Sequence, residues 1–155
     1  MNEPYDCTAD VLEHKRKVKD WMNQFSNILD RRALIHDDSK LQPPEKECFD
    51  TWMPELKTRE FGSEYYKVAL DAMGEGIAHH YRVNPHHPEH YENGVADMCL
   101  HDVVEMVCDW MAAAQAHGIP VDLDHAAKRF QLSPQLASII RNTLEEMNVT
   151  ATLAH

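Results

Sequence analysis

A histidine and an aspartate stand side by side at His36-Asp37, inside the run LIHDDSK over residues 34–40. Adjacent residues on an α-helix point about 100° apart, so these two side chains can reach one ion only where a helix ends or unwinds. An apolar run precedes the pair, and polar turn formers and Pro43-Pro44 follow it, which is the pattern of a helix end. An imidazole nitrogen with a carboxylate oxygen suits Mn, Fe, Ni or Zn better than Ca.

Histidine is frequent in this chain and concentrated in one stretch. The sequence holds 11 histidines in 155 residues, and five of them lie between His79 and His90. Two prolines and an Asn-Gly step predict an irregular loop over residues 81–94, and loops on a rigid helical frame often carry binding groups. The 4 cysteines form no CxxC pair, which argues against a zinc ribbon or a disulfide scaffold. The histidines therefore indicate a metal site of another kind.

The elements that position these groups are predicted to be helices, and the fold class is all-α. Only 5 glycines are present, and no alternating β-branched run reaches strand length. Helices are expected from Thr8 or Asp10 to about residue 25, from 27 to 36 after a Ser26 cap, from Pro44 to 54–56, from Gly62-Ser63 to about His80, from Asp97 to His117, and twice more between Val121 and Met147.

Helical periodicity predicts which way the candidate ligands face. His14 lies on the apolar stripe of the first helix, between Val11 and Val18, and is expected to face the core. His80 extends the apolar stripe of the fourth helix, whereas His79 points to the edge of that stripe. The fifth helix carries an acidic stripe at i, i+3 and i+7, formed by Asp102, Glu105 and Asp109.

Length and charge limit the classes of function. A chain of 155 residues is expected to form one domain, residues 1–155. The net charge of -11 argues against binding to a nucleic-acid polymer, although bound metal ions would still allow a small phosphorylated ligand. No signal-peptide pattern and no apolar window of ~18 residues is found, so we expect a cytoplasmic protein that does not cross a membrane. Homo-oligomerisation stays open.

The order His14, His36-Asp37, His80 and a fifth-helix aspartate, on an all-helical chain, resembles the HD-domain superfamily of metal-dependent phosphohydrolases. The run LIHDDSK looks like its apolar-His-Asp-x-Gly/Ser-Lys signature. Residues 86–94 are loosely similar to the His-His-Glu…Gly loop of its cyclic-dinucleotide branch, without the Tyr-Pro ending of that loop. The whole chain also looks like a small family of uncharacterised proteins common in phages. The resemblance covers about residues 8–115.

This resemblance implies an HD-like bundle of about six or seven helices, with a metal-binding core at about 8–115 and packing helices at about 121–148. It implies that the first metal site is formed by His14, His36, Asp37 and Asp109, with Asp102 as the alternative to Asp109. It also implies that His80, with His87 or His86, completes a second site or contacts phosphate. Lys40 would hold phosphate, as Arg82 or Lys15 also could. Glu89 would act as general base or orient a histidine. His79 could replace His80, either as a ligand of the second site or as a phosphate contact.

The activity that the resemblance implies is hydrolysis of a nucleotide or related small phosphorylated molecule by a metal-activated water. The expected cofactor is one or two divalent transition-metal ions (Mn, Fe, Co, Ni or Zn), with Mg as an alternative. A second hypothesis is a metal- or nucleotide-binding helical protein without turnover, such as a phage factor acting on a host component, because few Lys and Arg stand near the histidines. A third is another di-metal helical enzyme, such as an oxygenase.

Overall fold

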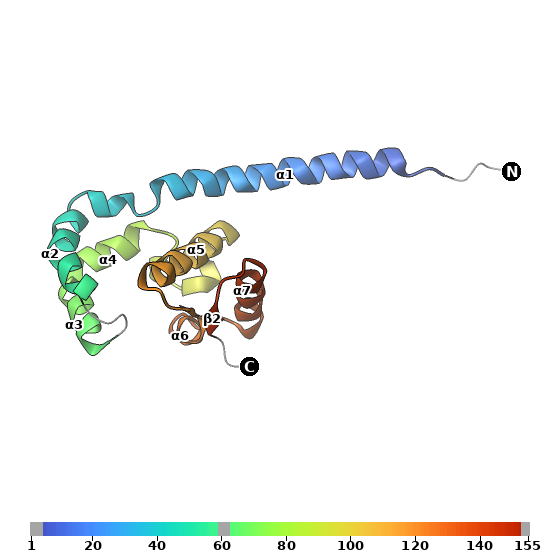
Figure 1. The fold of residues 1–155 in the computed structure, drawn as a ribbon. Helices are drawn as coiled ribbons and strands as arrows, with labels where there is room; N and C mark the ends of the chain where they lie inside the picture. The colour runs from blue at the N-terminus through green and yellow to red at the C-terminus, as the bar shows by residue number, and fades with distance from the viewer. Residues whose placement is uncertain (1–4, 59–62, 153–155) are drawn as a thin grey trace. The chain divides into compact units, whose positions relative to one another are not determined.

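A computed structural model describes residues 5–58 and 63–152 and confirms the all-α prediction (Figure 1). The chain divides into two compact units, residues 1–36 and residues 37–155. No helix in the described ranges is long and apolar enough to cross a membrane. The elements are α1 (Thr8–Ile35), η1 (Asp38–Leu41), α2 (Glu45–Thr58), α3 (Glu64–Ala72), α4 (Gly74–Val83), η2 (Pro88–His90), η3 (Gly94–Asp97), α5 (Leu100–His117), β1 (Val121–Asp122), α6 (Leu123–Arg129), α7 (Pro134–Glu146) and β2 (Ala151–Thr152).

The first unit is a single helix, α1, where the sequence predicted two helices joined near Ser26. A serine favours a helix N-terminus only modestly, and no Gly or Pro interrupts residues 8–35. Each further residue in a helix adds one backbone hydrogen bond, so the helix continues through Ser26. Within this unit none of the residues of α1 is buried, and His14 is exposed on the helix. The expectation that His14 faces a core stays a prediction.

The continuity of α1 also separates His14 from His36. His36 lies 22 positions after His14, which corresponds to about 33 Å along a helix axis. Ligands of one transition-metal ion lie within roughly 2.0–2.2 Å of it. Within one chain, the two histidines therefore cannot share an ion, and the predicted ligand set of the first metal site loses His14.

The end of α1 has the form that the sequence predicted. The helix ends at Ile35, and His36 takes an extended ψ of 125°. Asp37 then adopts the left-handed conformation, with φ 61° and ψ 13°. Aspartate is among the few non-glycine residues that occupy this region readily. η1 begins at the next residue, Asp38, with Asp37 as its N-cap.

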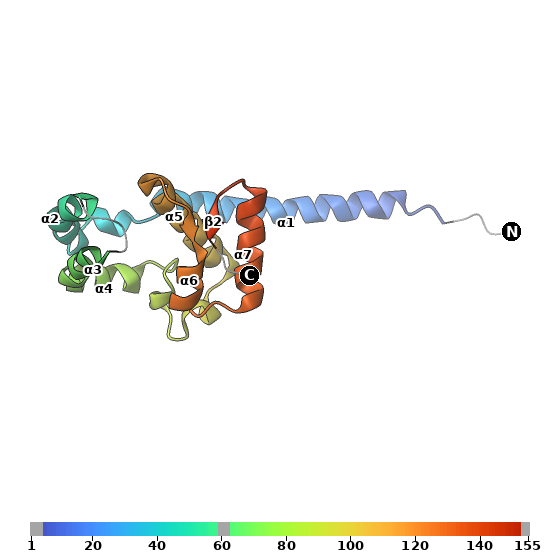
Figure 2. The same cartoon turned by 60° about the horizontal axis from the view of Figure 1, so that its bottom comes forward.

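Residues 37–155 pack around two apolar cores. α2, α3 and α4 enclose Leu56, Ala69 and Met73. α5, α6 and α7 enclose a larger core in which Met106, Leu123 and Leu144 are the largest buried apolar side chains. β1 pairs in parallel with β2, and α6 and α7 both contact β2 (Figure 2). The two helices predicted after Val121 are confirmed as packing elements.

Several helix boundaries differ from the prediction, including the start of α5, which lies at Leu100 and not at Asp97. The helix expected from Gly62-Ser63 to His80 divides into α3 and α4 at Gly74, whose φ of 39° lies in the left-handed region that glycine tolerates. Ser63 caps α3 as expected, by accepting a hydrogen bond from the backbone of Tyr66, while Gly62 lies outside the described residues. α2 continues past Pro54 to Thr58, which places Leu56 in the core.

Gly76 allows α2 and α4 to approach each other closely. A Cβ at this position would lie 2.4 Å from Sγ and 2.6 Å from Cβ of Cys48. Cys48 belongs to α2, and the two helices are in contact. The missing side chain therefore determines how closely Glu45 on α2 can lie to His80 on α4.

Replacing Gly76 by alanine is expected to lower the free energy of unfolding by about 1–2 kcal/mol. Overpacking costs roughly 1–3 kcal/mol, and alanine returns up to about 1 kcal/mol of helix propensity. Urea denaturation measures the change. Glu75→Ala, at an exposed position of the same helix, is the control. A Gly76→Ala midpoint equal to that of the unmodified protein would contradict the close packing.

Candidate metal centre

Four side chains of residues 37–155 converge in one place: Asp37, His80, His86 and His87. One ligand atom of each lies within 4.8 Å of those of the others. His80 Nε2 is 2.8 Å from His87 Nε2 and 3.4 Å from Asp37 Oδ1, and His86 Nε2 is 3.5 Å from Asp37 Oδ1. His80 and His86 are both 2% exposed. Three imidazoles and one carboxylate at these distances form a donor set for a transition metal.

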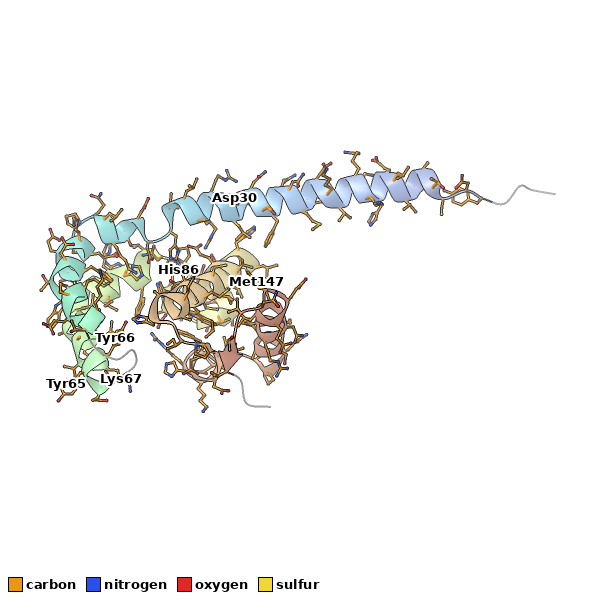
Figure 3. The ribbon with its side chains drawn as sticks, in the orientation of Figure 1. Asp30, Tyr65, Tyr66, Lys67, His86 and Met147 are labelled. Atoms are coloured by element: carbon orange, nitrogen blue, oxygen red, sulfur yellow. The ribbon has the colours of Figure 1, made fainter. Side chains whose placement is uncertain are left out.

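The cluster is assembled from a helix end and a loop. His80 lies in the last turn of α4, which ends at Val83 ahead of Pro85. The following segment carries His86, labelled in Figure 3, and His87. The side-chain amide of the buried Asn84 donates to the carbonyl of His80 at 2.9 Å, and the backbone N–H of His87 donates to the Asn84 carbonyl at 3.1 Å. The turn thus brings both loop histidines back over the helix end.

A buried carboxylate, Glu45, lies behind the cluster. It is the first residue of α2 and is 0% exposed. Its Oε1 is 2.6 Å from His79 Nδ1, and its Oε2 is 2.9 Å from His80 Nδ1. The Ser39 hydroxyl donates to Oε2 at 2.8 Å. Burial raises the pKa of Glu45, but the hydrogen bonds from His79, Ser39 and His80 lower it by more than burial raises it. The net shift of the pKa is therefore downward.

Two acids of α5 adjoin the cluster and a third does not. Glu105 Oε1 is 3.2 Å from His86 Nδ1. Asp109 has a carboxylate oxygen within 4.8 Å of an oxygen of Asp37. Asp102 instead accepts hydrogen bonds from the backbone of Cys99 and from the Tyr91 hydroxyl, both at 2.8 Å, and so caps the start of α5. Of the two aspartates left open by the sequence, the structure brings Asp109 to the site.

The environment of the cluster keeps two of its imidazoles, those of His80 and His87, in the neutral form that binds metals. Burial lowers the pKa of His87 to about 3, assisted by the nearby His86 and His80 and opposed by Asp109 and Asp37. Burial and then the charge of Lys40 lower the pKa of His80, against the opposing effects of Asp37 and Glu45. Metal ligation needs a lone pair on nitrogen, so at neutral pH both rings are in a state that can ligate.

The three residues predicted to act in catalysis have different surroundings. Lys40 Nζ is 2.6 Å from Asp37 Oδ2, so its charge lies at the cluster. His79 lies one residue before His80 and contacts Glu45. Glu89 is paired at 2.7 Å with Arg129 of α6, which also donates to the Tyr81 hydroxyl. Glu89 therefore joins the histidine loop to α6. Its predicted role as general base loses support because the carboxylate is already engaged by Arg129.

The histidines of the HD-like prediction are only partly brought together. His80 and His87 lie in the cluster as predicted, and His86, the alternative to His87, is there as well. His14 is elsewhere, on α1. His36 belongs to the unit of residues 1–36, so its ligand role stays a prediction that rests on its adjacency to Asp37.

Sequence reasoning missed Glu45 and Asn84. The signal for Glu45 was available but unspecific: an acid directly after Pro43-Pro44 reads as an ordinary first-turn acid of a helix. Asn84 precedes a proline in a segment predicted as irregular, where any polar residue is expected. Both residues acquire their roles from packing between segments distant in the chain, which a single sequence does not display.

Comparison with protein families places the chain in a family whose function is unknown. A family model described as a family of unknown function (DUF5662) matches residues 3–146. No curated protein and no solved structure matches the chain.

Proposed function

The chain belongs to the DUF5662 family, and from its histidine and carboxylate cluster we propose that it is a metal-dependent phosphohydrolase of the HD type, acting on a nucleotide or a related small phosphorylated molecule. The observation that supports this most is the convergence of Asp37, His80, His86 and His87 within 4.8 Å. A cytoplasmic location suits a substrate of this class.

The donor set fits a divalent transition metal. Imidazole suits Zn, Fe, Ni and related ions, whereas Mg favours an all-oxygen shell. Asp37, His80, His86 and His87 would hold one ion. Asp109, which lies beside Asp37, would serve as a further ligand of that ion or as a ligand of a second ion. When bound, such an ion lowers the pKa of its water toward ~7 and polarises a phosphoryl oxygen.

The neighbouring residues provide the other functions that phosphate hydrolysis needs. Lys40 places an ammonium group at the cluster, where it can hold a phosphate oxygen as a point charge. With a single ion held by the other four residues, Asp109 would instead accept the proton of the attacking water, because its carboxylate lies within 4.8 Å of Asp37. Glu105, 3.2 Å from His86 Nδ1, orients that ring, as ligand histidines usually require.

A second function, metal or nucleotide binding without turnover, is favoured by one observation. Lys40 is held by Asp37 and Arg129 by Glu89, so these two cations near the histidines are both engaged with carboxylates. A hydrolase would have to release Lys40 from Asp37 when phosphate binds. A phage factor that sequesters a ligand or acts on a host component would not need to release Lys40 from Asp37.

Metal analysis and a phosphate-release screen test the proposal. We expect EDTA-treated protein to regain close to one or two equivalents of Mn, Co, Ni or Zn, and the loaded protein to release phosphate from at least one nucleoside mono-, di- or triphosphate. His80→Asn should lose both properties, while His125→Gln, at an exposed position of α6, should keep them. Full metal content without release from any nucleotide would move the weight to the second function. Failure to bind any of these metals would overturn both metal-based functions.

A further inference from the structure

Glu45 joins two adjacent histidines through one buried carboxylate. Its two oxygens separate the contacts, with Oε1 at His79 Nδ1 and Oε2 at His80 Nδ1. We propose that Glu45 is a positioning residue of the metal centre, which fixes the proton of both imidazoles on Nδ1 and so presents the Nε2 lone pair of His80 to the ion. This inference rests on the proposed metal centre and assigns a role to a residue outside its ligand set.

The contacts of His80 favour one arrangement of protons, because the Asn84 amide, which is also 3.0 Å from Nδ1, already gives its two hydrogens to the His80 carbonyl and to Ser39. An ionised carboxylate only accepts hydrogen bonds, and a neutral imidazole has a single N–H. If the proton of His80 were on Nε2, a lone pair on Nδ1 would face a carboxylate oxygen at 2.9 Å, and the buried charge would lose a donor. The proton is therefore on Nδ1, and the lone pair is on Nε2, which lies 3.4 Å from Asp37 Oδ1 inside the cluster.

Further hydrogen bonds hold Glu45 in place. The Ser39 hydroxyl donates to Glu45 Oε2, and the Asn84 amide donates to the Ser39 oxygen, both at 2.8 Å. The same amide donates to the carbonyl of His80. This network links η1, α2 and the end of α4. Ser39, from the LIHDDSK run, thereby supports the same carboxylate oxygen that contacts His80.

The arrangement has a consequence for His87. His80 Nε2 and His87 Nε2 are 2.8 Å apart, a distance that requires a proton between them. Because His80 offers a lone pair there, His87 must be the donor in the metal-free protein, with its own proton on Nε2. To become a ligand through the same nitrogen, His87 has to move its proton to Nδ1. Glu45 thus makes His80 the pre-formed ligand and His87 the one that changes tautomer.

Nuclear magnetic resonance of the ¹⁵N-labelled, metal-free protein tests the assignment directly. Long-range ¹H–¹⁵N correlations distinguish the two neutral tautomers of each histidine, and single His→Gln variants assign the signals. We expect Nδ1–H for His79 and His80 and Nε2–H for His87. On addition of Zn(II), the His87 signals should change to the Nδ1–H pattern while those of His80 keep it. An Nε2–H tautomer of His80 in the unmodified protein would overturn the proposal.

The Glu45→Gln variant tests the effect on binding. Glutamine keeps the shape, but its amide nitrogen cannot accept, so one of the two histidines must change tautomer or lose its partner. We expect a 10–100-fold weaker affinity for Zn(II) by chelator competition, the range known for lost orienting groups, together with an altered tautomer of His79 or His80. Glu47→Gln, an exposed acid in the same turn of α2, is the control.

The outcomes separate this inference from the proposed function. A folded Glu45→Gln protein with unmodified affinity and tautomers would overturn the positioning role. If that variant does not fold, the tautomers of His79 and His80 in the unmodified protein still test the positioning role of Glu45. If the unmodified protein binds no metal, the proposed function fails, while the tautomer pattern that Glu45 imposes is still read from the metal-free state.

Discussion

Replacing Asp37 by asparagine is expected to weaken binding of Zn(II) or Mn(II) by at least about 100-fold without unfolding the protein. Asp37 is the carboxylate of the four-residue cluster, and its Oδ1 faces both His80 and His86. An amide oxygen has the same shape but carries no charge, so the ion loses its anionic ligand. Loss of an orienting group alone costs 10–100-fold, and loss of a ligand should exceed that range.

The choice of asparagine separates ligation from folding. Asp37 has φ 61°, and asparagine tolerates this left-handed backbone as readily as aspartate does. Chelator competition measures the affinity, and circular dichroism with thermal denaturation reports the fold. Asp38→Asn removes a neighbouring exposed acid and is the matched control. If Asp37→Asn binds both ions as tightly as the unmodified protein, the cluster is not the metal site.

The same metal titration can test His36, whose ligand role is still a prediction. His36→Gln combined with metal titration asks whether adjacency to Asp37 is enough to recruit the histidine. A loss similar to that of Asp37→Asn would make His36 a further ligand. A near-normal affinity would confine the site to residues 37–155, since His14 lies too far along α1 to replace it.

The parts of the fold predicted correctly from the sequence are those with a local cause. α5 ends at His117 as predicted, and the local causes are visible: Gly118 takes the left-handed conformation after α5, and Ser133 caps α7 through its side chain. The helix end at His36-Asp37 follows likewise from turn formers after an apolar run. Ser26 gave a similar local signal, but a lone serine is too weak to interrupt a helix that has neither Gly nor Pro nearby.

The features of the site that could not be predicted from the sequence depend on contacts between distant segments. Glu45 acquires its role because α2 approaches α4 at Gly76, and nothing near residue 45 encodes that approach. His86 and His87 stand next to each other in an irregular loop, where periodicity cannot tell which one points inward. Asp102 and Asp109 share one helix face, and only the hydrogen bonds of Asp102 to Cys99 and Tyr91 reveal that it serves as a cap.

Metal-free protein is expected to lose stability as the pH falls from 6.5 to 4.5. The pKa of His87 is about 3 in the folded protein against 6.5 ordinarily. Between these values the unfolded chain binds a proton that the folded protein does not, so unfolding becomes easier at up to about 1.4 kcal/mol per pH unit. The lowered pKa of His80 acts in the same direction. Because water reaches the partly exposed His87 ring, we expect a total near 2 kcal/mol.

Urea denaturation of EDTA-treated protein at several pH values in this window measures the slope, and the window stops above the range in which most carboxylates titrate. His87→Gln removes the titrating ring and should flatten the dependence. His125→Gln, which changes an exposed histidine of α6, should leave the slope unchanged. If His87→Gln keeps the full slope, the acid sensitivity has another source and His87 is not held neutral by its surroundings. A flattened slope would show that the cluster holds the His87 imidazole in its neutral, metal-binding form at a cost in stability. Bound metal can offset this cost, because ligation favours the same neutral ring.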